Sequence, residues 1–243
     1  MINPVRLEKL GSWFAGVSSV RDHEPCVLML STSNGLERAS VETFVGQSFE
    51  ASWNALSSHA STSFRKTLLD FEHVRVDRVS EIQTTSWAEL KALLSTTKRN
   101  YFGYGIALDP QFKHSFLWGE LNGNAMLYGG SEEEFAKLHV INFEKYARKK
   151  YGQPFVLNHD DDQPVYLFLT QGAYIGKDET VHGLEPHGVA VGRRTLPDLD
   201  ADSCRQLVFN ASEFLARQVK DSGQFVYGLF PCFNKAKSEN VPA

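Results

Sequence analysis

The residue types best suited to chemistry gather between residues 98 and 126 of the 243-residue chain. Glu120 could act as an acid or a base, and Arg99 could hold an anionic or polar substrate beside it. Asn122 and Asn124 would face the same way in an extended segment, where both amides could bind one ligand. The pattern therefore offers Glu120 and Arg99 as candidate catalytic residues, and the two asparagines as candidate substrate-binding residues.

The neighbouring run Tyr101-Phe-Gly-Tyr-Gly105 makes Tyr101 a further candidate for substrate binding. The run contains neither G-x-G-x-x-G nor a following G-K-[ST], so it does not predict a phosphate cradle. Nor does any serine lie in a G-x-S-x-G nucleophile elbow. The alternative role for Asn122 and Asn124 is the capping of strands and turns, which is common for asparagine.

A second polar cluster begins at His159, which precedes three consecutive aspartates. With His182, Glu185 and His187, the cluster offers enough nitrogen and oxygen donors for a divalent cation. However, adjacent side chains diverge, and the acidic run lacks the alternating donors and central glycine of a calcium loop. We therefore expect a solvated polar turn, with neither a metal nor another cofactor.

Four aromatic residues follow one another closely between Gly223 and Phe233. Aromatic faces beside polar groups suit sugar rings, and they suit a hydrophobic core equally well. We expect Phe225 to pack in the core and Tyr227 to be the ring that contacts a ligand.

The N-terminal part of the chain predicts a β-β-α-β-α unit. A hairpin of residues 26–45 turns at Ser33-Asn34-Gly35, and a helix of residues 48–60 can cover one of its faces. A third strand begins at Val74, and Ser86 with Glu89 has the spacing of a capping box for the next helix. This unit is expected to form a subdomain of residues 1–97.

The remaining residues, 98–243, predict a second α+β unit. Its expected strands lie at 101–108, 114–118, 155–157 and 165–170, the last extending through 173–175. Its expected helices begin at a capping box, Ser131 to Glu134, and after Pro197. The C-terminal helix, at 199–222, is amphipathic and is expected to close the fold. The fold class is therefore α+β, with a hairpin-containing subdomain packed on a second unit.

The C-terminal aromatic segment, Phe225-Val-Tyr-Gly-Leu-Phe-Pro-Cys-Phe-Asn-Lys235, resembles the opening of an (α/α) toroid domain. Such domains occur in bacterial proteins associated with surface-polysaccharide production, related in architecture to glucuronyl epimerases. Residues 101–110 and 120–125 look like parts of the α+β region that precedes such toroids. The resemblance, over residues 20–235, implies a role in bacterial glycan processing. Because a toroid needs many more helices, we expect its active site to be absent from this chain.

Composition describes an ordinary globular chain, with 42% hydrophobic and 22% charged residues. A net charge of −4 gives no electrostatic footprint for nucleic acid or an anionic bilayer. The N-terminus carries no basic and apolar leader, and no apolar run approaches a membrane span. Three cysteines without C-x-x-C spacing suggest reduced, buried thiols. We therefore expect a cytoplasmic protein.

Three functions stay open from the sequence. The first is an accessory or recognition module of a bacterial glycan-processing system, which binds a glycan or nucleotide-sugar and is not catalytic alone. The second is a small-molecule hydrolase or transferase with its site at the junction of the two units. The third is a structural module whose aromatic C-terminal segment docks on another protein.

Overall fold

In the part of the chain that it describes, the computed structural model contains fifteen helices and strands, and the chain divides into two compact units. It describes residues 4–17, 25–34, 38–63, 71–99, 101–128, 133–186, 188, 191–195, 200–217, 219 and 222–223, and the backbone of 228–230 and 235–237. The first unit holds residues 1–34 and 39–195, and the second holds 35–38 and 196–243. The elements of the first unit are α1 (Pro4–Gly16), β1 (Cys26–Ser33), β2 (Ser40–Gly46), α2 (Phe49–Ser63), β3 (His73–Ser86), α3 (Trp87–Thr96), β4 (Gly105–Ala107), β5 (Ser115–Phe116), α4 (Trp118–Gly123), α5 (Val140–Tyr151), β6 (Pro164–Ile175) and β7 (Val181–Gly183).

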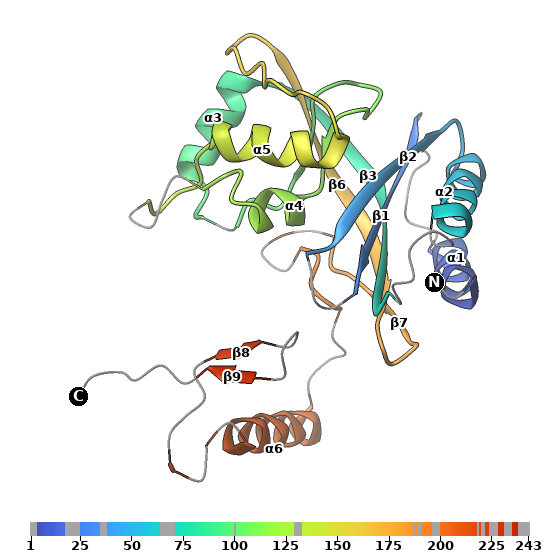
Figure 1. Ribbon diagram of the computed structural model, residues 1–243, viewed down its shortest axis with the longest axis vertical. Helices are drawn as coiled ribbons and strands as arrows, with labels where there is room; N and C mark the ends of the chain where they lie inside the picture. The colour runs from blue at the N-terminus through green and yellow to red at the C-terminus, as the bar shows by residue number, and fades with distance from the viewer. Residues whose placement is uncertain are drawn as a thin grey trace. The chain divides into compact units, whose positions relative to one another are not determined.

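One seven-stranded antiparallel sheet organises the first unit (Figure 1). Its strand order is β2-β1-β3-β6-β4-β5, and β7 pairs with β6. The two longest strands, β3 and β6, pair at its centre from Val74 to Ser86. The architecture is α+β, as the sequence predicts.

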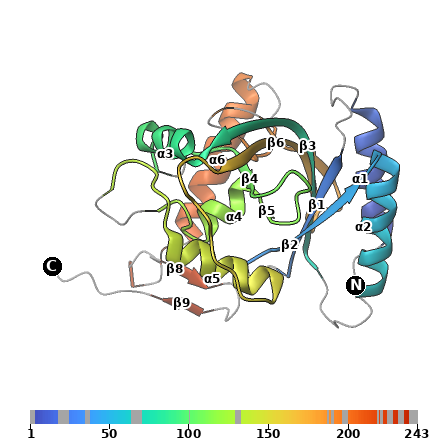
Figure 2. The same cartoon turned by 90° about the horizontal axis from the view of Figure 1, so that it is seen from above.

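The sheet is curled, so that its end strands β2 and β5 approach each other (Figure 2). Thr43 Oγ1 on β2 lies 3.1 Å from Ser115 Oγ on β5. The pairing of β3 with β6 shifts register between Val79 and Glu81, around Ser80. Such a bulge bends and twists a strand, which favours the curl. The sheet consequently has a concave and a convex face.

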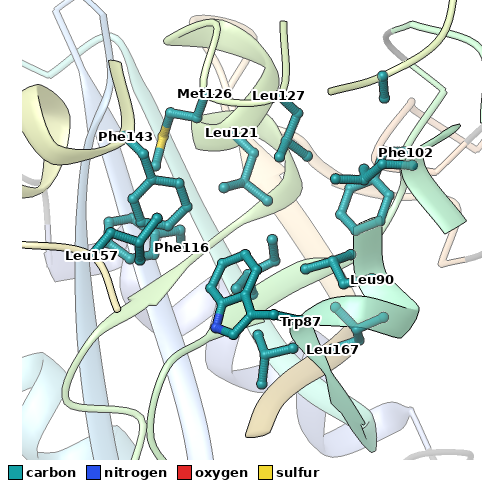
Figure 3. Packing of buried hydrophobic residues seen from close by; sticks show 14 of the residues in the cluster. Trp87, Leu90, Phe102, Phe116, Leu121, Met126, Leu127, Phe143, Leu157 and Leu167 are labelled. Carbon is teal, nitrogen blue, oxygen red and sulfur yellow. The ribbon is translucent and has the colours of Figure 1, made fainter. Parts of the chain in front are cut away.

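Helices cover the convex face in two places. Helices α1 and α2 pack on β1 and β3 through a cluster that includes Leu10, Leu30 and Leu56. A larger cluster joins α3, α4 and α5 to β4, β5 and β6, and Figure 3 shows Trp87, Phe116 and Phe143 within it. Burial of these side chains supplies the main hydrophobic stabilisation of the unit.

The concave face is apolar at its middle and polar towards one end. Its apolar part includes Met29, Val79, Ala107 and Phe168. Gly105 pairs with Phe168 across β4 and β6, and a Cβ at Gly105 would run into the Phe168 ring. The glycine therefore lets an aromatic ring lie over the backbone of the neighbouring strand.

Local sequence patterns predicted several elements correctly. The hairpin of β1 and β2, helix α2 and the capping box of Ser86 and Glu89 are confirmed. Helix α5 also ends as expected, with Gly152 in the left-handed conformation after three basic residues.

Other expected boundaries are wrong. Helix α5 begins at Val140 with His139 as its N-cap, because Phe135 instead forms a bridge with Lys98. Residues 155–157 form no strand. By contrast, the expected extension of the 165–170 strand through 173–175 is confirmed, because β6 runs unbroken through Gly172. Three elements of this unit, α1, α4 and β7, lay outside the prediction.

The two units divide the chain elsewhere than at the expected boundary between residues 97 and 98. Strand β3 lies before that boundary and β6 after it, yet the two pair over most of their length. The second unit contains α6 (Ala201–Arg217) and a hairpin of β8 (Gly228–Phe230) and β9 (Lys235–Lys237). Helix α6 is shorter than the expected 199–222. Within the described residues, no helix is long and apolar enough to cross a bilayer.

Candidate functional site

The polar end of the concave face is built by side chains from three neighbouring strands. Ser31 on β1 pairs with Arg75 on β3, which in turn pairs with Tyr174 on β6. Because directly paired residues share a face of the sheet, the three side chains form one row across it. They bring a hydroxyl, a guanidinium and a phenol together.

Arg75 is held in place by a buried carboxylate. Its Nε and Nη2 atoms donate to the two oxygens of Asp77, at 2.6 and 2.7 Å. Asp77 has no solvent exposure, and Thr170 Oγ1 donates to it at 2.9 Å. A Cβ at Gly172 would approach Asp77 Oδ1 to 2.5 Å, so the absence of a side chain there makes room for the carboxylate. Such a bidentate pair fixes the orientation of the guanidinium.

Part of the Arg75 guanidinium stays available. Its Nη1 atom has no hydrogen-bond partner among the described residues, and the side chain is 23% exposed. Burial disfavours the charged form, but the charge and hydrogen bonds of Asp77 outweigh it and raise the pKa of Arg75. The guanidinium also lies over the Trp118 ring, 5.7 Å from its centroid. Arg75 thus presents a permanent, oriented cation.

Two paired segments, residues 183–185 and 192–195, form the arms of a hairpin that lies over this row. The amide of Thr195 donates to Gly183 O at 2.9 Å, and the amide of Leu184 donates to Gly172 O on β6 at the same distance. Gly192 has a φ of +68°, and a Cβ there would enter the Trp118 ring. A glycine at this position therefore allows the hairpin to approach the sheet closely.

Sheet and hairpin border an open cavity of about 290 Å³. Its lining combines two arginines, a histidine and several hydroxyl groups with a few apolar residues: Ser31, Thr32, Ser33, Ala39, His73, Arg75, Tyr174, Leu184, Gly192 and Arg194. Among the described residues, the lining contains no carboxylate. Most of the exposed lining surface is apolar, so the cavity suits a small ligand that has an apolar face as well as hydroxyl groups and an anionic group.

Asp178 and His182 lie close to this lining. His182 Nε2 lies 2.5 Å from Asp178 Oδ2, and the His182 ring is tilted against Tyr174 with centroids 5.0 Å apart. The hydrogen bond from His182 lowers the pKa of Asp178, and the charge of Arg194 acts in the same direction. Asp178 thus orients the His182 ring, which packs against Tyr174 at the end of the row.

Glu120, the candidate acid or base, is buried among groups that use both its oxygens. Oε2 accepts the amide of Leu117 at 2.8 Å, which caps α4. Oε1 accepts hydrogen bonds from Tyr146 Oη and Lys150 Nζ, each at 2.7 Å. Its ion-pair partner is Lys150 and not Arg99. The role that these contacts support is structural.

The other sequence candidates do not converge on one site. Arg99 donates to Tyr128 Oη at 3.2 Å and lies over the Tyr128 ring. Residues 118–123 are helical and not extended, so Asn122 and Asn124 do not face the same way. Their amides donate to Phe102 O and Glu120 O respectively.

Tyr101 and Tyr227 are the aromatic candidates for ligand binding. Tyr101 is 56% exposed. Tyr227 and Phe225 lie outside the described residues.

The second polar cluster forms an exposed turn in which Lys91 Nζ donates to Asp161 at 2.7 Å. That hydrogen bond, with the lysine charge, lowers the pKa of Asp161. Across the described ranges, no three His, Cys, Asp or Glu side chains gather closely enough to hold a metal ion. Of the cysteines, Cys26 is a buried free thiol, whereas Cys204 is exposed, contrary to expectation.

Comparison of the chain with known protein families, curated proteins and solved structures finds no match.

Proposed function

We propose that this chain is a recognition module, without catalysis of its own, that binds a small hydroxyl-bearing anion in the cavity on the concave face. The observation that carries the proposal is Arg75. Asp77 holds its guanidinium through Nε and Nη2, and Arg75 lines the cavity together with hydroxyl-bearing side chains. Preorganised donors of this kind bind anions at low entropic cost.

Sugars with an acidic substituent are the ligand class that fits this lining best. Ser31 and Tyr174 bring hydroxyl groups that can both donate and accept, as sugar hydroxyls require. The resemblance of residues 20–235 to polysaccharide-associated proteins favours the same class, and it favours a bacterial cytoplasmic setting. In this proposal the chain is an accessory part of a glycan-processing system.

A catalytic role is less well supported by these contacts. The described lining of the cavity contains His73 but no carboxylate that could pair with it for acid or base work. Glu120 is engaged by Leu117, Tyr146 and Lys150, so neither of its oxygens is left to meet a substrate. We therefore propose binding and not turnover.

Isothermal titration calorimetry with the full chain tests the proposal. The probes are glucose, galactose and mannose, each as the neutral sugar, the uronate and the 6-phosphate. We expect at least one anionic form to bind, and its neutral parent to bind much more weakly. Failure of every anionic probe to bind would reject the proposed function.

A matched pair of variants localises the binding. Arg194 lines the cavity, whereas its exposed neighbour Arg193 does not. Arg194→Gln should weaken binding about tenfold or more, because a charge-assisted hydrogen bond is lost. Arg193→Gln makes the same change in net charge and should bind like the parent. Equal affinities for the two variants would place the ligand elsewhere.

A further inference from the structure

The charges around the cavity restrict the kind of anion that it can hold. Arg75 and Arg194 are the two arginines of the lining, and Asp77 lies directly behind Arg75. Asp178, near Arg194, is 53% exposed and is hydrogen-bonded to His182. Arg75, Arg194 and Asp77 together carry one excess positive charge, and the nearby carboxylate of Asp178 reduces it further.

The geometry of Arg75 restricts the anion further. Asp77 occupies the edge formed by Nε and Nη2, so the edge that remains is the one between Nη1 and Nη2. One guanidinium edge matches the two coplanar oxygens of a carboxylate. A phosphate would keep a third oxygen and a second charge to be satisfied by the rest of the cavity.

We infer that the site selects a carboxylate monoanion, such as an acidic sugar, over the phosphate dianion of a sugar phosphate. This inference rests on the proposed function. Asp77 is the specificity-determining residue: its buried negative charge offsets part of the positive potential that Arg75 and Arg194 create, so that the cavity attracts one negative charge on the ligand but disfavours a second.

The affinities of each uronate and the corresponding 6-phosphate, measured at pH 7.5, test the inference. The uronate should bind about tenfold more tightly or better, since the second charge of the phosphate finds no partner. A 6-phosphate that binds as tightly as its uronate, or more tightly, would overturn the inference but leave the proposed function intact. Failure of both classes to bind would reject the proposed function, and the inference with it.

A charge-adding variant avoids disturbing the buried pair. Ala39 is exposed and lines the cavity, so Ala39→Lys adds one cation there without removing a contact of Asp77. The preference for uronate should then shrink severalfold in favour of the phosphate. Val45→Lys, on the same strand region but outside the lining, is the control and should leave the ratio unchanged. An unchanged ratio in Ala39→Lys would contradict selection by charge.

Discussion

Lys150 Nζ lies 2.7 Å from Glu120 Oε1 and 2.8 Å from the carbonyl oxygen of Ser115, and both charged side chains are less than 10% exposed. Ser115 belongs to β5, an end strand of the sheet. Its amide also donates to Tyr151 Oη at 2.8 Å. Helix α5 thus uses two side chains to satisfy the open edge of β5, where another strand would otherwise pair.

Removing the Glu120 carboxylate should destabilise the protein strongly. Glu120→Ala leaves the Lys150 ammonium buried without its partner, which typically costs about 3–5 kcal/mol. Urea denaturation measures this change in the free energy of unfolding. Glu133→Ala removes the exposed partner of Lys137 and should cost less than about 1 kcal/mol. Equal, small losses for both variants would mean that the Lys150 pair does not hold α5 to the sheet.

Tyr151 should make stability depend on pH in the alkaline range. Burial raises the pKa of Tyr151 above its ordinary value of 10.0, so above pH 10 the unfolded chain releases a proton that the folded chain keeps. Stability should therefore fall as pH rises through this window, by up to about 1.4 kcal/mol per pH unit.

The comparison of two variants isolates this effect from other titrations. Burial lowers the pKa of Lys150, which by itself would raise stability as the pH approaches 10.5. Tyr151→Phe should remove the fall that tyrosine causes, whereas Tyr101→Phe, at an exposed ring, should not. The free energy of unfolding is measured between pH 8 and 11. If it changes with pH equally in the parent and in Tyr151→Phe, the phenol is not buried as described.

Gly105 should tolerate no side chain. A Cβ at Gly105 would lie within 3 Å of the Phe168 ring, and overpacking of this kind costs about 1–3 kcal/mol. At Gly119, in α4, the described residues place no atom within 4 Å of the point that a Cβ would occupy, so Gly119→Ala should be neutral or stabilising. Thermal denaturation of the two variants checks the prediction, and a Gly105→Ala protein as stable as Gly119→Ala would refute the close approach of Phe168.

The capping box of α3 should contribute measurably to stability. Ser86 Oγ accepts the amide of Glu89 at 3.2 Å, and the amide of Ser86 donates back to the Glu89 carboxylate. Ser86→Ala should cost about 1 kcal/mol in chemical denaturation. Ser95→Ala, near the other end of the helix, is the control and should cost less. A loss no larger than that of the control would argue against the cap.

Patterns that depend on neighbours in the chain were predictable, and contacts between distant segments were not. The alternation of Val74 and Val76 with Arg75 and Asp77 predicts a strand, and it puts the two charged residues on one face. It cannot show that this face is concave and lies beneath the segments 183–185 and 192–195. That arrangement depends on the bulge at Ser80 and on glycines whose neighbours come from other strands.

For the same reason, the sequence did not indicate the residues that form the candidate site. Glu120 and Arg99 are close in the sequence and rich in chemistry, but Glu120 is paired with Lys150, thirty positions away. Ser31, Arg75, Tyr174 and Arg194 lie far apart along the chain, and only strand pairing brings them together. The only sequence signal that bears on this site is the alternation of residues along each strand, which shows which side chains of that strand lie on the same face of the sheet.

A nitrogen-15 NMR titration of the full chain tests the central claim most directly. The probes are glucuronate, galacturonate and glucose 6-phosphate. Bound ligand should shift the Arg75 Nε–Hε resonance and the amides of Ser31, Ser33 and Tyr174, while the amides of Asn122 and Asn124 stay unchanged. Shifts centred on Glu120, Asn122 and Asn124, or no shifts with any probe, would contradict an anion site on the concave face of the sheet.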